Sequence, residues 1–287
     1  MPLFRPPAEG ENLIIQATLG CSFNRCSFCA MYRSKQYQAR PLAAVGADIQ
    51  AAALEWPETR RVFLADGDAL ALPTPHLLAI LAQLQRSFPR LTRVSCYATP
   101  ANIRHKSEAE LRQLRENRLN LLYVGVESGS DTLLKKITKG ANARSIAAAL
   151  HLAHAAGLKV SASVILGLGG RGYWREHIDA TAQLLAQAPV SYLSTLQLIL
   201  DQSIRAEFLA KFGEPFSAQD DLGILAEQQR LIRQLAPPQP VVFRTNHASN
   251  ALALAGNLPR DRERLLGQIE LAMAGQRPLR PAHLRGL

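Results

Sequence analysis

Short apolar runs alternate with amphipathic stretches through the first two hundred residues of the chain. The apolar runs, rich in β-branched and aromatic residues, predict strands at 13–18, 61–65, 93–97, 120–126, 159–166 and 191–199. Apolar residues at helical spacing between these runs predict helices at 41–54, 75–87, 107–117, 143–156 and 173–187. Strands that alternate with helices through short connections indicate right-handed βαβ units on a parallel sheet, and hence an α/β fold.

Several residues mark the ends of these helices. Pro41 and Pro75 stand where a first-turn proline is tolerated, and Ser107 with Glu110 fits a capping box. Gly157 follows the fourth helix, where a C-terminal glycine is expected. These signals support the helical assignments.

The number of strand–helix units limits the architecture. Six units are too few for a closed eight-stranded barrel, so the alternatives are a partial barrel and a doubly wound open sheet. In both, function collects at the C-terminal ends of the strands. After residue 200 the pattern changes, with helices predicted at 203–212, 220–234 and 259–274 and a short apolar run at 241–243. We therefore expect one domain at residues 1–200 and a mixed C-terminal extension at 201–287 that caps the barrel mouth.

Composition and charge narrow the class of protein. Hydrophobic residues make up 47% of the chain, which is ordinary for a globular protein. No apolar run has the length of a transmembrane helix, and the start lacks the apolar core of a secretory signal peptide, so we expect a cytoplasmic protein without a membrane partner. The formal net charge of +10 favours anionic partners, nucleic acid among them. Because the charges are dispersed, an ordinary solvated basic surface is the stronger explanation.

Three of the four cysteines lie close together directly after the first predicted strand. Cys21, Cys26 and Cys29 form a C-x4-C-x2-C pattern, and soft thiolates at such spacing suit an iron–sulfur cluster or zinc. A plant-type [2Fe–2S] site shares the spacing but needs a fourth cysteine, and only Cys96 remains, inside a predicted strand. Structural zinc needs four ligands, and no histidine lies nearby in sequence. The third alternative is a three-thiolate [4Fe–4S] cluster with one open iron.

This third alternative resembles the radical S-adenosylmethionine (SAM) superfamily. In that family three cysteines follow the first strand of a partial (β/α)6 barrel, a partial TIM barrel, and Phe28 matches the aromatic residue before the last cysteine. The loop between Cys21 and Cys26 is one residue longer than in the family's commonest C-x3-C-x2-C pattern. The resemblance implies a [4Fe–4S] cluster on Cys21, Cys26 and Cys29, with SAM bound at the open iron.

Motifs at later strand ends extend the resemblance. Asp66-Gly67-Asp68 is similar to a Gly-Gly-Glu-Pro segment that receives the amino group of SAM in this family. The stretch YVGVESGSD ends the fourth strand, and the resemblance implies that Glu127, with Ser128 beside it, faces SAM and that Lys139 approaches the SAM carboxylate. The structural alternatives are an ordinary Asp-Gly turn and a Glu–Lys ion pair.

Two further strands carry candidate SAM contacts. Tyr97 ends the third strand as a polar residue, and alternation along the strand turns Cys96 away from it into a buried position. On the fifth strand, the resemblance places Ile165 beside the adenine of SAM and Ser163 near the ribose. A buried strand followed by a turn explains the fifth-strand pattern equally well.

The resemblance implies a reaction but no substrate. The reduced cluster would cleave SAM to a 5′-deoxyadenosyl radical, which abstracts hydrogen from an unidentified substrate, and the basic surface favours an anionic one. The electron would come from a reductant such as flavodoxin or ferredoxin. The alternatives are an RNA-modifying radical SAM enzyme and a non-enzymatic iron–sulfur electron-transfer or sensor protein. Relatives with auxiliary clusters need more cysteines than this chain contains.

The C-terminal third holds the candidate substrate residues Arg244, Asn246 and His247, within the stretch RTNHASN. Arg244 could bind an anion, and His247 could exchange a proton near neutral pH. The Asn-His-Ala-Ser-Asn stretch also resembles a poorly characterised, single-cluster group of radical SAM proteins, a resemblance that brings no activity with it. A loop that caps itself through local hydrogen bonds is the structural alternative.

Overall fold

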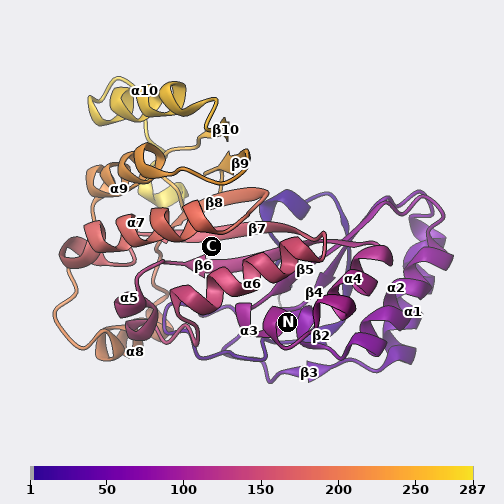
Figure 1. Cartoon of the computed structure of the whole chain (residues 1–287). Coiled ribbons are helices and arrows are strands. Elements are labelled where there is room, and N and C mark those ends of the chain that lie inside the picture. Colours follow the sequence, from indigo (N-terminus) through magenta and orange to yellow (C-terminus); the bar gives the residue numbers. More distant parts are fainter. Residues whose placement is uncertain (1–2, 287) are drawn as a thin grey trace. The chain divides into compact units, whose positions relative to one another are not determined.

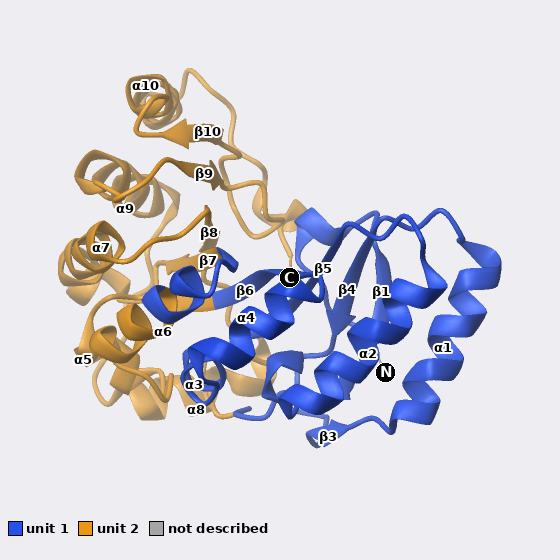
Figure 2. Cartoon of the chain, turned by 45° about the vertical axis from the view of Figure 1, so that its right-hand side comes forward, with its two compact units in different colours: residues 1–24, 31–124, 151–160 blue, residues 25–30, 125–150, 161–287 orange. Residues whose placement is uncertain are grey.

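The strands and helices predicted from the apolar pattern are present, most of them within one or two residues of the expected ends. The computed structural model describes residues 3–286. The chain divides into a first unit of Met1–Asn24, Met31–Val124 and His151–Val160 and a second unit of Arg25–Ala30, Gly125–Leu150 and Ser161–Leu287 (Figure 2). This division differs from the predicted boundary after residue 200, which stays a prediction. The predicted outer limits at residues 1 and 287 lie outside the described residues.

The first unit contains four parallel strands in the order β1-β4-β5-β6 (Figure 1). They are β1 (Leu13–Gln16), β4 (Arg61–Ala65), β5 (Arg93–Ala98) and β6 (Leu119–Glu127), whose last residues belong to the second unit. Its other elements are the antiparallel pair β2 (Thr18–Leu19) and β3 (Gln38–Ala39), the helices α1 (Leu42–Glu55), α2 (Thr74–Ser87), α3 (Pro100–Arg104) and α4 (Glu108–Glu116), and the short 3₁₀ turns η1 (Pro7–Glu9) and η2 (Ala69–Ala71).

The core of the first unit forms around β4. Its residues from Val62 to Ala65 are fully buried, as expected for a parallel strand covered on both faces. The rings of Phe63, Tyr97 and Tyr123, on three neighbouring strands, meet edge to face with centroid distances of 5.2 to 6.1 Å. Fully burying one such ring, as at Phe63, stabilises the fold by about 2–3 kcal/mol, so these contacts favour the register in which the three rings meet.

The second unit continues the chain with β7-β8-β9-β10, of which the first three pair in parallel and the last pairs antiparallel. The strands are β7 (Lys159–Leu166), whose first two residues belong to the first unit, β8 (Tyr192–Gln197), β9 (Val241–Arg244) and β10 (Ala255–Leu258). The helices are α5 (Asp131–Lys136), α6 (Ala143–Ala155), whose residues from His151 on belong to the first unit, α7 (Gly170–Gln187), α8 (Gln202–Phe212), α9 (Asp221–Gln234) and α10 (Arg262–Met273), followed by the 3₁₀ turn η3 (Ala282–Leu284). Helix α9 packs against both α7 and α10, and the three lie in a row in Figures 1 and 2.

The helix-end signals act as predicted except at Pro41. Ser107 and Glu110 form a complete capping box at the start of α4. Gly157 takes a φ of +77° after α6, a left-handed conformation that glycine adopts without strain. Pro75 lies in the first turn of α2, whereas Pro41 is the N-cap of α1.

A buried ionic cluster ties the N-terminal segment to the first unit. The carboxylate of Glu9 is fully buried and accepts hydrogen bonds from the Tyr123 hydroxyl at 2.5 Å and from Arg93 Nη2 at 2.9 Å. Asn12 Nδ2 donates to the same carboxylate. Removing one partner would leave a buried charge unpaired, so this cluster holds residues 7–12 in place.

These observations confirm the predicted α/β class with parallel strands in each unit. The six strands expected from the sequence correspond to β1, β4, β5, β6, β7 and β8. In the region after residue 200, β9 extends the parallel arrangement beside β8. Among the described helices, none combines the length and apolar character needed to cross a membrane.

Candidate functional site

The first half of the cysteine loop is fixed by side chains of the first unit. Cys21 follows β2 and Gly20, which has a φ of +66°. The backbone N–H of Ser22 donates to Asp68 Oδ1 at 2.9 Å, and its hydroxyl donates to Asp68 Oδ2. Asn24 adopts a φ of +42°, and its Nδ2 donates to the carbonyls of Tyr32 at 2.8 Å and Lys35 at 3.3 Å. The longer segment between Cys21 and Cys26 is therefore held by the hydrogen bonds of Ser22 and of Asn24.

The Asp66-Gly67-Asp68 segment follows β4 and touches this loop. Asp66 is fully buried, and its Oδ2 pairs with Lys35 Nζ at 2.6 Å. Its Oδ1 has no hydrogen-bond partner among the described residues. The N–H of Gly67 donates to the Gly20 carbonyl at 3.1 Å, and a Cβ at position 67 would lie 2.8 Å from the Cβ of Cys21. Only glycine fits there, because the two loops approach each other so closely.

Asp68 is buried and accepts several hydrogen bonds. Besides the two from Ser22, its Oδ2 accepts one from Asn102 Nδ2 at 3.1 Å. Burial and the neighbouring Asp66 raise the pKa of Asp68, against the effect of these hydrogen bonds. Burial, Asp68 and Cys21 together raise the pKa of Tyr37 to about 12. The carboxylate of Asp68 thus organises the cysteine loop, while the Asp66 carboxylate keeps one oxygen for a further donor.

Cys96 and Tyr97 point in opposite directions from β5. Tyr97 is half-buried within the aromatic triangle with Phe63 and Tyr123. Cys96 is fully buried, and burial raises the pKa of its thiol to about 12. An un-ionised, inaccessible thiol is a poor metal ligand, since ligation requires the thiolate. Cys96 therefore has the buried role expected from strand alternation.

The second half of the cysteine loop lies in the second unit. The N–H of Cys29 donates to the Cys26 carbonyl at 3.1 Å, and the N–H of Ser27 donates to the Ile137 carbonyl at 3.0 Å. The Phe28 ring centroid lies 6.0 Å from Lys139 Nζ. Burial lowers the pKa of Lys139, but the negative charges of Glu127, Cys26 and Cys29 outweigh it and raise that pKa above its usual value. This part of the loop is therefore packed against the turn that carries Lys139.

Glu127 and Lys139 form a nearly buried ion pair. Lys139 Nζ lies 2.9 Å from Glu127 Oε1, and both side chains are 9% exposed. Glu127 takes a φ of +64°, an uncommon conformation for a non-glycine residue. A Cβ at Gly125 would lie 1.9 Å from Glu127 Oε1 and 2.8 Å from Lys139 Nζ. The glycine two residues before Glu127 therefore makes the room that the pair occupies.

The neighbouring strand ends of the second unit are joined by a buried histidine. Ser128 Oγ lies 2.8 Å from His177 Nδ1, and His177 Nε2 lies 2.9 Å from the Ile165 carbonyl. Because a carbonyl can only accept, Nε2 carries the proton, and the Ser128 hydroxyl donates to Nδ1. Burial lowers the pKa of His177 to about 4. Ser163 and Ile165 share the half-exposed face of β7, opposite its buried residues.

Among the candidate substrate residues, Arg244 ends β9, and Asn246 and His247 lie in the following loop, which bonds mainly to itself and to β8. Arg244 Nη1 donates to the carbonyls of Phe243 and Gly256 at 2.8 and 3.2 Å. His247 Nδ1 accepts from the Ser249 N–H at 3.1 Å, and burial together with Arg280 lowers the pKa of His247. Asn246 is exposed.

The structure thus places the predicted residues in two groups, one in each unit. Cys21, Asp66, Gly67, Asp68 and Tyr97 belong to the first unit, and the others to the second. In the part of the chain that is described, no group of three or more His, Cys, Asp or Glu side chains is gathered as a metal site.

Sequence reasoning missed four polar residues that organise the first group, namely Ser22, Lys35, Tyr37 and Asn102. Ser22 carried a weak signal, as a polar residue next to the first cysteine. The other three make contacts across more than thirty residues, which spacing along the chain does not reveal.

Comparison with known proteins places the chain in a family. Residues 15–185 match the model of the radical SAM superfamily. The chain is 27% identical over 169 residues to a protein of Methanocaldococcus jannaschii named putative methylthiotransferase MJ0865, a match that covers 55% of this chain and 36% of that protein. The chain therefore spans little more than a third of this relative.

Two solved structures share the fold. One is coproporphyrinogen III oxidase (HemN) from Escherichia coli, described as a radical SAM enzyme, with a TM-score of 0.57, 19% identity and coverage of 78% of this chain and 52% of that one. The other is methylornithine synthase (PylB), with a TM-score of 0.55, 14% identity and coverage of 94% and 83%.

These findings confirm the predicted resemblance to the radical SAM superfamily and the fold class, whereas the resemblance of the Asn-His-Ala-Ser-Asn stretch stays a prediction. The matched residues include the three loop cysteines and every predicted SAM contact, and they end before Arg244. Because the family model covers more than half of the chain, this protein belongs to the radical SAM superfamily.

Proposed function

We propose that the protein is a radical SAM enzyme in which Cys21, Cys26 and Cys29 hold a [4Fe–4S] cluster. When bound, such a cluster with SAM supplies reductive cleavage of SAM to a 5′-deoxyadenosyl radical. The observation that carries the proposal is the contrast among the cysteines. The three loop thiols are half-exposed, whereas Cys96 is buried with a raised pKa. The chain thus offers three thiolate ligands and no accessible fourth among the described residues, a donor set that leaves one iron open.

The residues of each unit also suit SAM. The Glu127–Lys139 pair presents an acceptor and a donor 2.9 Å apart, which complements the ammonium and carboxylate of an amino acid group. In the first unit, the unpartnered Oδ1 of Asp66 would accept a hydrogen bond from a ligand. Tyr97, Ser163 and Ile165 would contact the nucleoside. Ser128 would instead act as a positioning residue for the end of β6, since its hydroxyl is hydrogen-bonded to His177.

Anaerobic reconstitution tests this proposal. The wild-type chain should bind about four irons and form 5′-deoxyadenosine from SAM with dithionite. Cys26→Ala should lose both iron and turnover, because a ligand is removed. Cys96→Ala is the matched control and should keep both, since that thiol is buried and un-ionised. Iron binding and turnover that survive in Cys26→Ala would overturn the proposal.

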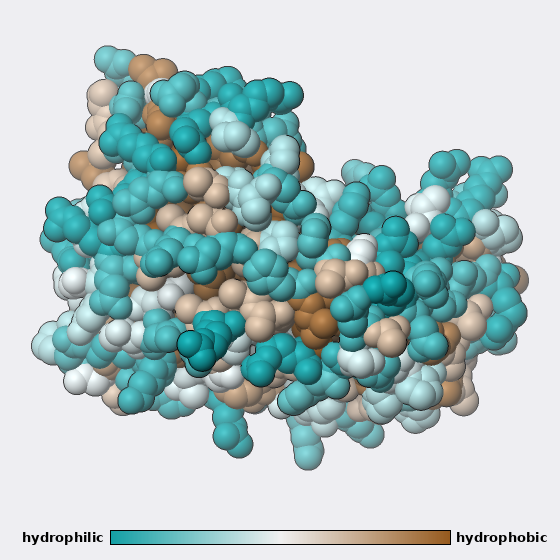
Figure 3. All heavy atoms as spheres, viewed as in Figure 1, coloured by the Kyte–Doolittle hydropathy of each residue, from teal (hydrophilic) through white to brown (hydrophobic). Residues whose placement is uncertain are grey.

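The same preparation separates the two alternatives. A fully protein-ligated electron-transfer or sensor cluster would give an electron paramagnetic resonance spectrum that SAM leaves unchanged. An RNA-modifying enzyme would bind RNA with strong salt dependence. Hydrophilic residues are spread over the face shown in Figure 3, with apolar residues among them. A cytoplasmic location and a flavodoxin or ferredoxin as reductant remain part of the proposal.

A further inference from the structure

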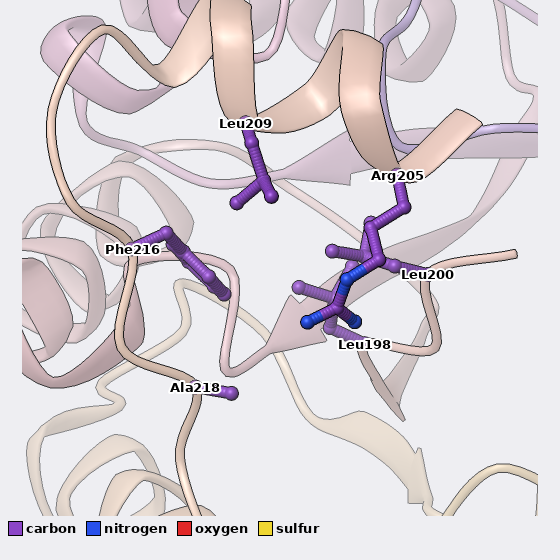
Figure 4. Close-up of a pocket in the computed structure, with 6 residues that line it drawn as sticks. All are labelled: Leu198, Leu200, Arg205, Leu209, Phe216 and Ala218. Carbon is purple, nitrogen blue, oxygen red and sulfur yellow. The ribbon is translucent and has the colours of Figure 1, made fainter. Parts of the chain in front are cut away.

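A cavity of about 160 Å³ lies in the second unit, where the chain leaves β8 and enters α8 (Figure 4). Its walls are contributed by the segment after β8, by α8 and by the segment between α8 and α9. They are lined by Leu198, Leu200, Arg205, Leu209, Phe216 and Ala218. The cavity opens to solvent, since Arg205, Leu209 and Ala218 are exposed, and its volume is about that of a site that holds a benzene-sized group. Because the strand ends of this fold class carry function, the position suits a binding site.

The walls of the cavity are held in place before any ligand binds. The Phe216 ring packs edge to face on Phe208 at 5.1 Å and on Phe212 at 4.9 Å between centroids. The adjacent Ser217 carbonyl accepts a hydrogen bond from the Arg171 N–H at 2.8 Å. On the opposite side, the Leu198 N–H donates to the Leu166 carbonyl at 2.9 Å. A ligand would therefore enter a preformed space and lose little free energy in ordering it.

Arg205 is the only charged residue on the cavity wall; its side chain is exposed to solvent and has no protein partner among the described residues. In Figure 4 its guanidinium extends from α8 toward Leu198, alongside the cavity. An ion pair within α8 joins Glu207 to Lys211 at 2.7 Å and does not involve Arg205. Asp201, four residues before Arg205, instead accepts hydrogen bonds from Ser203.

Arg205 also lies near the N-terminal end of α8, where the helix dipole disfavours a cation. An anion at the guanidinium would interact favourably with the arginine charge and with the positive end of the helix dipole. The guanidinium forms two parallel hydrogen bonds with a carboxylate, which makes a carboxylate the anion that best fits its geometry.

We propose that this cavity binds an apolar carboxylic acid, with a ring-sized apolar group between Leu209 and Phe216 and its carboxylate on Arg205. That this acid is part of the enzyme's substrate rests on the proposed function. That the cavity binds such an acid is independent of it, because the cavity involves neither the cysteines nor the SAM contacts.

Calorimetric titration of the full-length chain with 3-phenylpropionate tests the site. The acid should bind at least tenfold more tightly than 3-phenylpropionamide, which has the same ring but no charge. Acetate, which has the charge but no ring, should bind at least tenfold more weakly than the acid. Equal binding of the acid and the amide, or of the acid and acetate, would overturn the proposal, as would no binding of the acid at millimolar concentration.

Variants locate the binding. Arg205→Gln should remove the preference for the acid over the amide, whereas Arg144→Gln, which removes another exposed arginine of the second unit, should keep it. Ala218→Leu should fill the cavity and weaken both acid and amide at least tenfold. A circular dichroism melt shows that each variant is folded. A preference that persists in Arg205→Gln places the probe elsewhere and overturns the assignment.

The outcome is separable from that of the proposed function. Failure to cleave SAM with intact 3-phenylpropionate binding leaves the cavity as a site and removes only its link to radical chemistry. Cleavage of SAM without probe binding refutes the cavity assignment and leaves the proposed function standing.

Discussion

At the scale of single residues, the most informative backbone conformation is the positive φ of Glu127. Its φ of +64° lies in a region that costs about 1–3 kcal/mol for residues other than glycine, and such outliers cluster at functional sites. The conformation directs the carboxylate to Lys139 and is possible because position 125 has no side chain. The strain at Glu127 thus accompanies a charge pair that the proposed function uses to hold SAM.

Gly125→Ala tests this arrangement. The new methyl group would overlap the Glu127 carboxylate, so the ion pair should separate and 5′-deoxyadenosine formation should fall by about tenfold or more. The variant should also unfold at a lower temperature in the absence of SAM. Both are measured on the reconstituted chain.

Gly172→Ala is the matched control. A Cβ at that position of α7 meets nothing within 4 Å, so alanine should raise stability by up to about 1 kcal/mol and leave turnover unchanged. A Gly125→Ala variant that behaves like Gly172→Ala would contradict the role assigned to the glycine.

At the scale of elements, the sequence predicts most strands and helices because their signals are local. Strands β4 and β7 have the predicted ends, and the capping box of α4 is present. Strand β10 was missed because Ala255-Gly256-Asn257-Leu258 has poor strand propensity and is extended only through its pairing with β9. The helix α5 was missed because six residues are too few for a helical period to stand out.

The loop between β9 and β10 is attached to the rest of the second unit by Asn250. Its Nδ2 donates to the carbonyls of Thr195, on β8, at 2.7 Å and Thr245 at 3.0 Å, and the residue is buried. Asn250→Ala should therefore lower the free energy of unfolding by about 2 kcal/mol, measured by urea denaturation. Asn246→Ala, in the same loop but exposed, should change it by less than about 0.5 kcal/mol. Equal effects of the two variants would show that these hydrogen bonds do not hold the loop.

At the scale of the whole molecule, two buried ionisable groups give opposite pH dependences. Burial raises the pKa of Glu227 to about 7, against hydrogen bonds from Gly167 and Gln219, so its contribution to stability falls as pH rises from about 4.5 to 7. His177, with a pKa lowered to about 4, is neutral in the fold, so its contribution rises with pH from about 4 to 6.5. Each amounts to about 3 kcal/mol, and the two largely cancel where they overlap.

Glu227→Gln should remove one side of this balance. The unfolding free energy of the variant should then rise by about 3 kcal/mol relative to wild type between pH 4.5 and 7, measured by urea denaturation at several pH values. Glu263→Gln, at an exposed position of α10, should leave the wild-type profile unchanged. Parallel profiles for Glu227→Gln and wild type would show that Glu227 does not titrate in this range.

Across the molecule, the sequence predicted the family and the residue types of the site better than their partners. The cysteine spacing and Glu127 stand out because they are local patterns at strand ends. The Lys35–Asp66 pair and the Asp68–Asn102 hydrogen bond were not predictable, because each joins residues more than thirty positions apart that the fold alone brings together. The same holds for the cavity at Arg205, whose walls come from three separate segments.

The turn at Asn24 has an evolutionary consequence. The longer spacing between Cys21 and Cys26 is accommodated by a left-handed residue at position 24 and by the hydrogen bonds between Ser22 and Asp68. The length of the cysteine loop and the residue at position 68, shortly after β4, should therefore have changed together during divergence. Homologues that keep four residues between these cysteines should retain an acidic side chain at position 68 and asparagine or glycine at position 24, whereas homologues with three should be released from both constraints.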